Sequence, residues 1–222
     1  MKKIPIFKKI PPHIIREVAM NNEKIPTLYS HKNFFLRESF WLRLRFIHRL
    51  MLKNYINEKN CFDFGGGGGV FLPTLSYIFE HVACGDKFCN EAESIVKIYG
   101  LKNVDFFECD LLNFKSSGKT YDVVIAADVL EHFPSLLAPV TKIKELLKAE
   151  GVLFTSLPSE NSFYLFLRKI FGIQKPSDHY HTATQVESFL EAQGFLRIQT
   201  LYVPLYVPLF KLFHVSAWKR ND

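Results

Sequence analysis

Five consecutive glycines, Gly65 to Gly69, constrain the fold of this 222-residue chain more than any other feature of its sequence. They follow an apolar run at residues 61–64 and precede a helical pattern that begins near Val70. Glycine loses more backbone freedom on folding than any other residue, so such a run is tolerated where a ligand must approach the main chain closely. The sequence therefore predicts a strand, a ligand-binding glycine loop and a helix, in that order.

The spacing of the loop distinguishes three kinds of nucleotide-binding site. A phosphate-binding P-loop would end in Gly-Lys-Ser/Thr, whereas this loop continues into Val70 and Phe71. The dinucleotide fingerprint Gly-x-Gly-x-x-Gly fails in every register, because its last glycine would fall on Val70, Phe71 or Leu72. The pattern that fits is Asp-x-Gly-x-Gly-x-Gly, formed by Asp63, Gly65, Gly67 and Gly69.

Short apolar runs alternate with helical patterns from residue 60 onward, which is typical of strand–helix units in a parallel sheet. The runs expected to form strands lie at residues 61–64, 81–85, 104–108, 121–126 and 152–157. Two later segments, 195–203 and 210–219, have no helical pattern between them, so we expect them to pair antiparallel at one edge, with the bend at 201–208. The sequence predicts an α/β fold: a doubly wound, mostly parallel, seven-stranded Rossmann-like sheet with an antiparallel C-terminal edge strand and helices on both faces.

Helix boundaries are indicated by residues that cap or stop helices. Those expected to do so are Asn90 with Glu93, Gly100, Ser135, Gly151, Thr184 with Glu187, and Gly194.

The N-terminal 58 residues are expected to differ from the rest. Prolines interrupt residues 1–30, which indicates an extended arm, whereas Trp41, Leu44, Ile47 and Met51 recur at helical spacing within 33–55. We therefore expect an arm and an amphipathic helix at 1–58, serving as a substrate cap or as packing, and a core domain at 59–222.

Composition and charge restrict the class of protein. The net charge is +6, with much of the basic charge in the first 50 residues, which weakly favours anionic partners, although a solvated basic face is the plainer explanation. The apolar tracts are too short or too broken by proline for a signal peptide or a membrane span. Reduced thiols and a cytoplasmic location are expected from the four cysteines, which lack paired CxxC spacing: Cys61, Cys84, Cys89 and Cys109.

With this loop in place, the sequence from about residue 60 to 200 resembles the class I S-adenosylmethionine-dependent methyltransferases, of the type that acts on small molecules. The resemblance implies S-adenosylmethionine as the cofactor and S-adenosylhomocysteine as the product. It implies that Gly65, Gly67 and Gly69 pass close beneath the methionine part of the cofactor. Asp63, which closes the first strand, would help to hold the amino acid end.

Acidic residues at three further strand ends extend the resemblance. It implies that Asp86, with Lys87 beside it, accepts hydrogen bonds from the ribose hydroxyls. Asp110 would accept from the adenine amino group, with the backbone amide of Leu111 meeting the ring, and Asp128 would line the methyl donor. Taken alone, Asp86 and Asp110 also fit a plain turn residue.

Two histidines are candidate catalytic residues, and no metal is expected. His132 follows the fourth strand beside the expected methyl position, where a neutral imidazole could remove a proton from the acceptor. Orientation of the loop or contact with the cofactor by Glu131 and His132 is the alternative. His181 is expected to contact the acceptor or to serve as a base, with a structural hydrogen bond as the alternative. No acidic or cysteine cluster of convincing spacing completes a metal site around His179 and His181.

The methyl acceptor is not identified by the sequence, but its class can be narrowed. The aromatic segment 161–174 could pack on the domain, cover a hydrophobic or lipid-linked acceptor, or contact a membrane surface. Nucleic acid is a weaker candidate, because the segment after the fourth strand lacks the Asp/Asn-Pro-Pro-Tyr/Phe motif of base-amino methyltransferases. We expect methyl transfer to an oxygen or nitrogen nucleophile of a small molecule, with a catalytically inactive S-adenosylmethionine-binding module as a further alternative.

Overall fold

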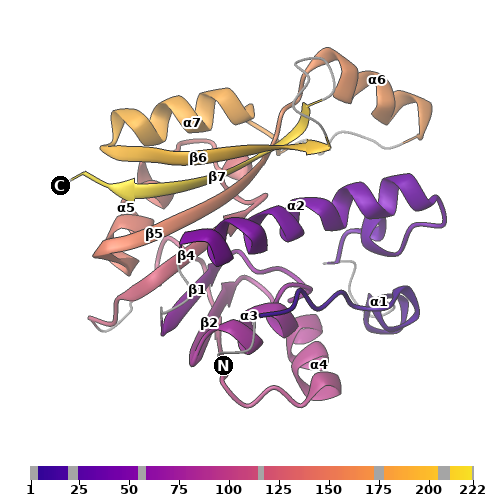
Figure 1. The fold of residues 1–222 in the computed structure, drawn as a ribbon, viewed down its shortest axis with the longest axis horizontal. Helices are drawn as coiled ribbons and strands as arrows, with labels where there is room; N and C mark the ends of the chain where they lie inside the picture. The colour runs from indigo at the N-terminus through magenta and orange to yellow at the C-terminus, as the bar shows by residue number, and fades with distance from the viewer. Residues whose placement is uncertain are drawn as a thin grey trace.

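The computed structural model describes residues 5–19, 25–54, 59–114, 118–172, 178–204 and 211–221. In these residues seven strands form one sheet in the order β3-β2-β1-β4-β5-β7-β6 (Figure 1). Their bounds are β1 Asn60–Phe64, β2 His81–Asp86, β3 Val104–Glu108, β4 Tyr121–Ala127, β5 Leu147–Pro158, β6 Phe195–Pro204 and β7 Lys211–Arg220. Neighbouring strands run parallel except around β7, which is antiparallel to both β5 and β6. The predicted fold class is confirmed. In the antiparallel pair, β6 is the edge strand of the sheet, and β7 lies between β6 and β5.

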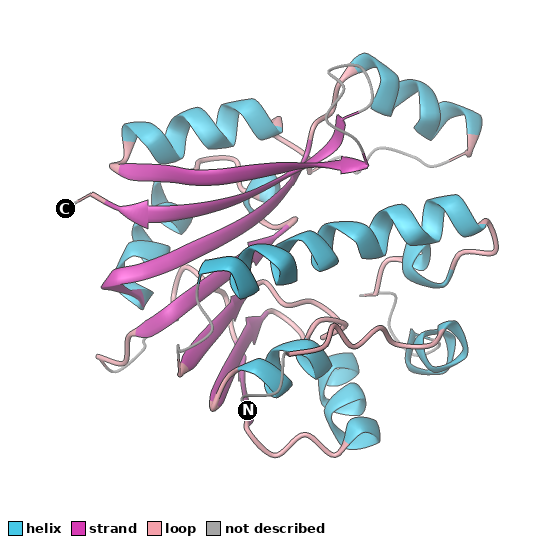
Figure 2. Ribbon diagram, viewed as in Figure 1, coloured by secondary structure: helices cyan, strands magenta, loops and turns pink. Residues whose placement is uncertain are grey.

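Helices cover both faces of the sheet (Figure 2). Alternate side chains of each central strand enter two hydrophobic clusters: on β1, Cys61 packs on one face, and Phe62 and Phe64 pack on the other. Strands buried on both faces appear in the sequence as short continuous apolar runs, which is why they could be predicted. The first face carries α1 Pro12–Ala19, α2 Phe34–Asn54, α3 Leu72–Ile78, α4 Asn90–Tyr99 and α6 Ser162–Ile170, and the second carries α5 Leu137–Leu146 and α7 Ala183–Ala192.

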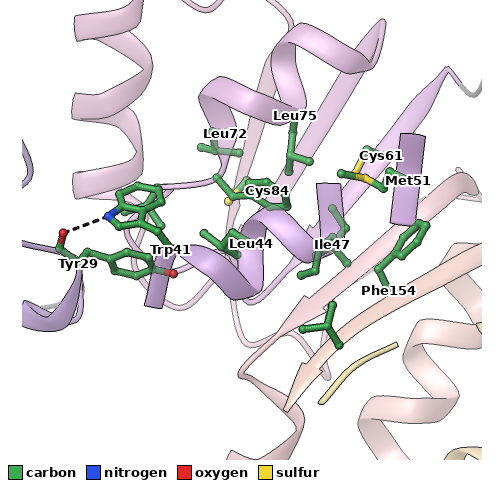
Figure 3. Packing of buried hydrophobic residues seen from close by; sticks show 14 of the residues in the cluster. Tyr29, Trp41, Leu44, Ile47, Met51, Cys61, Leu72, Leu75, Cys84 and Phe154 are labelled. Carbon is green, nitrogen blue, oxygen red and sulfur yellow. Dashed lines mark hydrogen bonds between the residues drawn. The ribbon is translucent and has the colours of Figure 1, made fainter. Parts of the chain in front are cut away.

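The long helix α2 lies across the first face of the sheet, as its apolar spacing predicted (Figure 1). Trp41, Leu44, Ile47 and Met51 are buried between α2 and the sheet (Figure 3). The indole Nε1 of Trp41 donates to the backbone oxygen of Tyr29 at 3.1 Å. The N-terminal segment is thereby joined to the main hydrophobic core.

The first 30 residues are not a simple extended arm, which corrects the prediction. Pro12 begins α1, and Thr27–Ser30 forms a short 3₁₀ helix, η1. Proline is favourable in the first turn of a helix because it gives up an N–H that has no partner there. The prolines therefore mark helix starts as well as interruptions.

The capping box of α7 is formed two residues earlier than predicted. Thr182, rather than Thr184, is the N-cap, and its side chain and that of Gln185 exchange hydrogen bonds with each other's backbone amides. Glu187, the predicted partner of Thr184, is instead buried and accepts a hydrogen bond from Ser216 of β7 at 3.2 Å. Both spacings match the capping pattern, so only the tertiary packing of Glu187 decides between them.

Two other helix starts also differ from the prediction. No side chain caps α4: its N-cap is Cys89, not Asn90 paired with Glu93. Instead Glu108 of β3 accepts the N–H of Cys89 at 3.1 Å. The third predicted helix is α5, which begins after Leu136 without a cap from Ser135 and ends at Leu146, because the chain then joins β5, where Gly151 lies. Gly100 and Gly194, at φ values of 61° and 82°, follow α4 and α7 as predicted.

Other sequence expectations are met only in part by the described residues. The four cysteines are free thiols. Within the described ranges, no helix combines the length and the apolar character that a bilayer span requires. Of the predicted bend at 201–208, residues 201–204 belong to β6 instead, and residues 205–208 lie outside the described part of the chain.

Candidate active site

The glycine loop leaves the carboxyl end of β1 with its pattern glycines in the left-handed region. The φ angles are 75° at Gly65, 53° at Gly67 and 73° at Gly69. The N–H groups of Gly65 and Gly66 both point to the backbone oxygen of Gly85 on β2, at 2.9 and 3.4 Å. A Cβ on Gly65 would lie 2.4 Å from a methyl group of Val129. Only glycine can follow this path, which brings bare backbone to the carboxyl edge of the sheet.

Two aspartates flank the glycine loop at the ends of β1 and β2. Asp86 accepts a hydrogen bond from the N–H of Gly67 through Oδ2 at 2.9 Å, so it holds the loop in place. Asp63 is 3% exposed, and burial, with a smaller effect from the Asp86 charge, raises its pKa to about 7. These two carboxylates and the loop lie where open α/β sheets bind ligands.

The aspartate that follows β3 lies in a turn. Asp110 is exposed, and its two carboxylate oxygens accept from the N–H of Leu112 at 3.1 Å and from the amide of Asn113 at 3.3 Å. Leu111 is buried, and Lys87 is exposed next to Asp86. Asp110 therefore makes the contacts of a turn residue. Each carboxylate oxygen still has a free lone pair, and an adenine amino group would have to donate to one of these.

The end of β4 is connected to β5 and to the N-terminal helix. Asp128 has a φ of 53°; its N–H donates to the backbone oxygen of Ser156 at 2.8 Å, and its Oδ1 accepts from the Ser156 hydroxyl at 3.0 Å. Its other oxygen pairs with the guanidinium of Arg43, which comes from α2 and also donates to the Tyr29 hydroxyl at 2.6 Å. Sequence reasoning missed Arg43, because a basic residue on an amphipathic helix is usually solvated.

A cluster of acidic and histidine side chains lies beside the 3₁₀ helix that follows β4. Glu131 and His132 lie on the short 3₁₀ helix η2 (Leu130–His132), and Glu131 is fully buried, which raises its pKa to about 8. His132 Nδ1 lies 2.9 Å from Asp178, and burial lowers the pKa of this histidine. His179 meets the His132 ring edge-on with centroids 4.6 Å apart, and its Nδ1 lies 2.9 Å from Glu160.

The structure brings His179, rather than His181, into contact with His132. The backbone N–H of Tyr180 donates to the oxygen of Glu131 at 2.8 Å, which fixes this loop against η2. His181 lies next in the chain, and its Nε2 is buried with no hydrogen-bond partner among the described residues. Asp178 and Glu160 could not have been selected from the sequence, since their roles depend on where the loop folds back.

An apolar groove of about 420 Å³ lies between α2, α6 and the start of β7. Phe40 and Phe213 line it and also flank the Arg43 guanidinium, whose carbon is 4.5 and 5.4 Å from the two ring centres. The groove therefore ends beside the Arg43–Asp128 pair. A second cavity, at Thr120, Lys144 and Arg220, includes none of the predicted site residues.

The sheet order and the glycine loop are those of a class I S-adenosylmethionine-dependent methyltransferase. Solved structures of the same fold include the N-methyltransferase NodS from Bradyrhizobium japonicum WM9 in complex with S-adenosyl-L-homocysteine. It is 17% identical with a TM-score of 0.67, covering 95% of this chain and 97% of that one. Another is the magnesium protoporphyrin IX methyltransferase from Synechocystis PCC 6803 with bound S-adenosylhomocysteine, which is 20% identical with a TM-score of 0.68, covering 95% and 100% of the two chains.

The family model described as a methyltransferase domain matches residues 35–200, and the chain belongs to this family. Its curated relatives include the ubiquinone biosynthesis O-methyltransferase of Paraburkholderia xenovorans (strain LB400), 28% identical over 177 residues that cover 73% of this chain and 75% of the relative. The mitochondrial ubiquinone biosynthesis O-methyltransferase of Bos taurus is 29% identical over 204 residues, covering 81% of this chain and 54% of the relative. The predicted enzyme class is confirmed.

Proposed function

We propose that the chain binds S-adenosylmethionine across the carboxyl ends of β1 to β4, with the roles that the sequence predicted. Gly65, Gly67 and Gly69 would lie against the methionine part, and Asp63 would hold its ammonium group. The single observation that carries this site is the bond from Gly67 to Asp86, because it joins the loop to the carboxylate assigned to the ribose. Lys87, Asp110, the amide of Leu111 and Asp128 complete the proposed cofactor contacts.

Titration calorimetry with S-adenosylhomocysteine tests this site. Asp86→Ala removes both the ribose acceptor and the bond to Gly67, so binding should weaken by about 2 to 4 kcal/mol. Asp105→Ala, at an exposed carboxylate on β3, is the matched control and should bind as the wild type does. Unchanged affinity in Asp86→Ala would show that the cofactor lies elsewhere. No binding by the folded wild type would instead favour a module without this function.

We propose further that the acceptor is a small molecule with an apolar part and a hydroxyl group. The names of the curated relatives support O-methylation, and the apolar groove supports an apolar part. Phe40 of α2 and Leu167 of α6 line the groove. An acceptor bound there would therefore be capped by segment 1–58 and covered by α6. Exposed Phe166 and Ile170 on α6 also support contact with a membrane surface that holds such an acceptor.

His132 is the catalytic side chain in this proposal. Its lowered pKa keeps the imidazole neutral near pH 7, and Asp178 fixes the ring through Nδ1, which leaves Nε2 to accept the acceptor's proton. The acceptor oxygen then attacks the methyl carbon, the carbon–sulfur bond breaks, and its electron pair stays on sulfur. The products are a methyl ether, S-adenosylhomocysteine and protonated His132. His181 is proposed as a second contact to the acceptor.

Methyl transfer from radiolabelled S-adenosylmethionine tests the acceptor class. Two phenolic acceptors that are identical except for a long alkyl tail should have different KM values. The phenol with the tail should have the lower KM. Leu167→Gln should raise the KM of the tailed acceptor and leave that of the short one unchanged, whereas Leu137→Gln, at an exposed leucine on α5, should change neither. Transfer to RNA or DNA in preference to both phenols would refute the small-molecule proposal.

A further inference from the structure

Among the described residues that line the apolar groove between α2, α6 and the start of β7, Arg168 of α6 alone carries a charge. We propose that this side chain selects acceptors that bear a single negative charge, such as a carboxylate, beside their apolar part. The inference rests on the proposed function, because it gives the small-molecule acceptor a further chemical feature. It makes Arg168 a specificity-determining residue.

The guanidinium of Arg168 is held in place, but part of its hydrogen-bonding capacity is unused. The side chain is 11% exposed. Its Nη2 donates to the Tyr164 hydroxyl at 3.3 Å, and its guanidinium carbon lies 4.8 Å from the centre of the same ring. Its Nη1 is buried and makes no hydrogen bond within the described part of the chain. A buried donor without an acceptor costs free energy, which a ligand oxygen would recover.

Glu160 is the nearest candidate partner for this charge. Its Oε1 lies 4.0 Å from Nη1 of Arg168, a distance that allows electrostatic attraction but is too long for a hydrogen bond. The same oxygen lies 2.9 Å from Nδ1 of His179. Glu160 therefore offsets part of the guanidinium charge and leaves Nη1 for a ligand. Because of that offset, a ligand with one negative charge fits this position better than one with two.

The other polar side chains of the groove are largely engaged by their own backbone. The Ser39 hydroxyl donates to the backbone oxygen of Phe35 at 2.8 Å, and Asn33 Oδ1 accepts the N–H of Leu36 at 3.3 Å. The remaining lining is mostly aliphatic and aromatic, so water screens a charge pair there less than at an exposed surface. A planar guanidinium also matches the two oxygens of a carboxylate, which a neutral amide reproduces only in part.

Arg168 is connected to the proposed reacting group through two neighbouring side chains. Glu160 contacts both Arg168 and His179, and the His179 ring meets the His132 ring edge-on with centroids 4.6 Å apart. An acceptor whose carboxylate binds Arg168 could therefore direct its hydroxyl toward His132 while its apolar part fills the groove. In this arrangement Arg168 determines which acceptors bind and how they are oriented, without touching the reacting atoms.

Titration calorimetry with octanoate and octanamide at pH 8 tests this recognition without any methyl transfer. The two ligands have the same alkyl chain and differ in the charge of the head group. The wild type should bind octanoate at least about tenfold more tightly than octanamide, because hydrogen bonds to charged groups are the stronger ones. Arg168→Gln should bind the two ligands within about threefold of each other, and Arg168→Lys should keep part of the preference.

Lys169→Gln is the matched control for these variants. Lys169 is the exposed neighbour of Arg168 on α6 and does not line the groove, so its loss removes the same charge and should leave the preference for octanoate unchanged. Equal binding of octanoate and octanamide by the wild type would overturn the inference. An Arg168→Gln variant that is folded by circular dichroism but loses affinity for both ligands equally would also overturn it, because Arg168 would then have only a structural role.

Methyl transfer to a tailed phenol that carries a carboxylate, compared with its matched carboxamide, connects this binding to the proposed function. Arg168→Gln should raise the KM of the acid at least about tenfold and leave its kcat, and both constants of the amide, unchanged. A wild type that prefers octanoate but methylates neither phenol would contradict the proposed function and leave the acid-binding role of Arg168 standing. A wild type with the same kcat/KM for the acid and the amide would overturn the acid selectivity and leave methyl transfer standing.

Discussion

Replacing Asp63 by asparagine should make the protein's stability less sensitive to pH. The folded-state pKa of Asp63 is about 7 against an ordinary value of 3.8, because the carboxyl is buried and lies near the Asp86 charge. The folded protein therefore favours the protonated form. The stability that this group contributes is fully present below pH 3.8 and is lost as the pH rises through 7.

The size of the effect follows from the shift. One pKa unit corresponds to about 1.4 kcal/mol. The raised pKa of Asp63 therefore costs about 4 kcal/mol of stability at pH 8, where the group is mostly ionised in both states, but only about 1.5 kcal/mol at pH 5, where it is protonated in the folded state alone. The substituted asparagine would not ionise, although its buried amide adds a cost that is independent of pH. The gain of Asp63→Asn over the wild type should therefore grow by about 2.5 kcal/mol between pH 5 and pH 8.

Urea unfolding at pH 5 and pH 8, without cofactor, measures the difference in the free energy of unfolding between Asp63→Asn and the wild type. Asp105→Asn, at an exposed carboxylate on β3, is the control for the chemistry of the substitution. A gap between Asp63→Asn and the wild type that stays constant within about 0.5 kcal/mol would refute the argument from burial. In the same series, S-adenosylhomocysteine should bind the wild type more tightly as the pH rises from 6 to 8, because the proposed ammonium contact needs the ionised carboxylate.

Three further predictions concern the scaffold, and urea unfolding measures all of them. Thr182→Ala should cost about 1 kcal/mol by removing the α7 cap, whereas Thr184→Ala at an exposed position should cost less than about 0.5 kcal/mol; equal losses would contradict the assigned cap. Gly69→Ala should destabilise by about 1 to 3 kcal/mol, because φ is 73° and the new Cβ would meet Ala92 at 2.7 Å; wild-type stability would show that the loop lies differently. Trp41→Ala should cost about 3 to 5 kcal/mol if α2 is part of the core, and a loss below about 1 kcal/mol would mean that it is not.

The sequence predicted the positions of the candidate site residues that close strands better than the positions of those that lie in loops. Asp63 and Asp86 could be placed because they close strands that are buried on both faces, and such strands are recognisable by their apolar runs. The partners of His132 and His179 could not be placed, since Asp178, which meets His132, and Glu160, which meets His179, lie in loops after β5 that return to η2 only in the folded chain. Local patterns also misplaced the α7 cap, because two overlapping sequences fit it and only the burial of Glu187 distinguishes them.

The position of β7 has a consequence for how the chain is made. The edge strand β6 pairs with β7 alone, yet β7 follows it in the sequence and also pairs with β5. During synthesis β6 must therefore leave the ribosome before its neighbour exists, and β5 keeps one open edge until the same moment. Completion of the sheet must consequently wait until residues 211–220 are synthesised, because they insert between two segments that precede them in the chain.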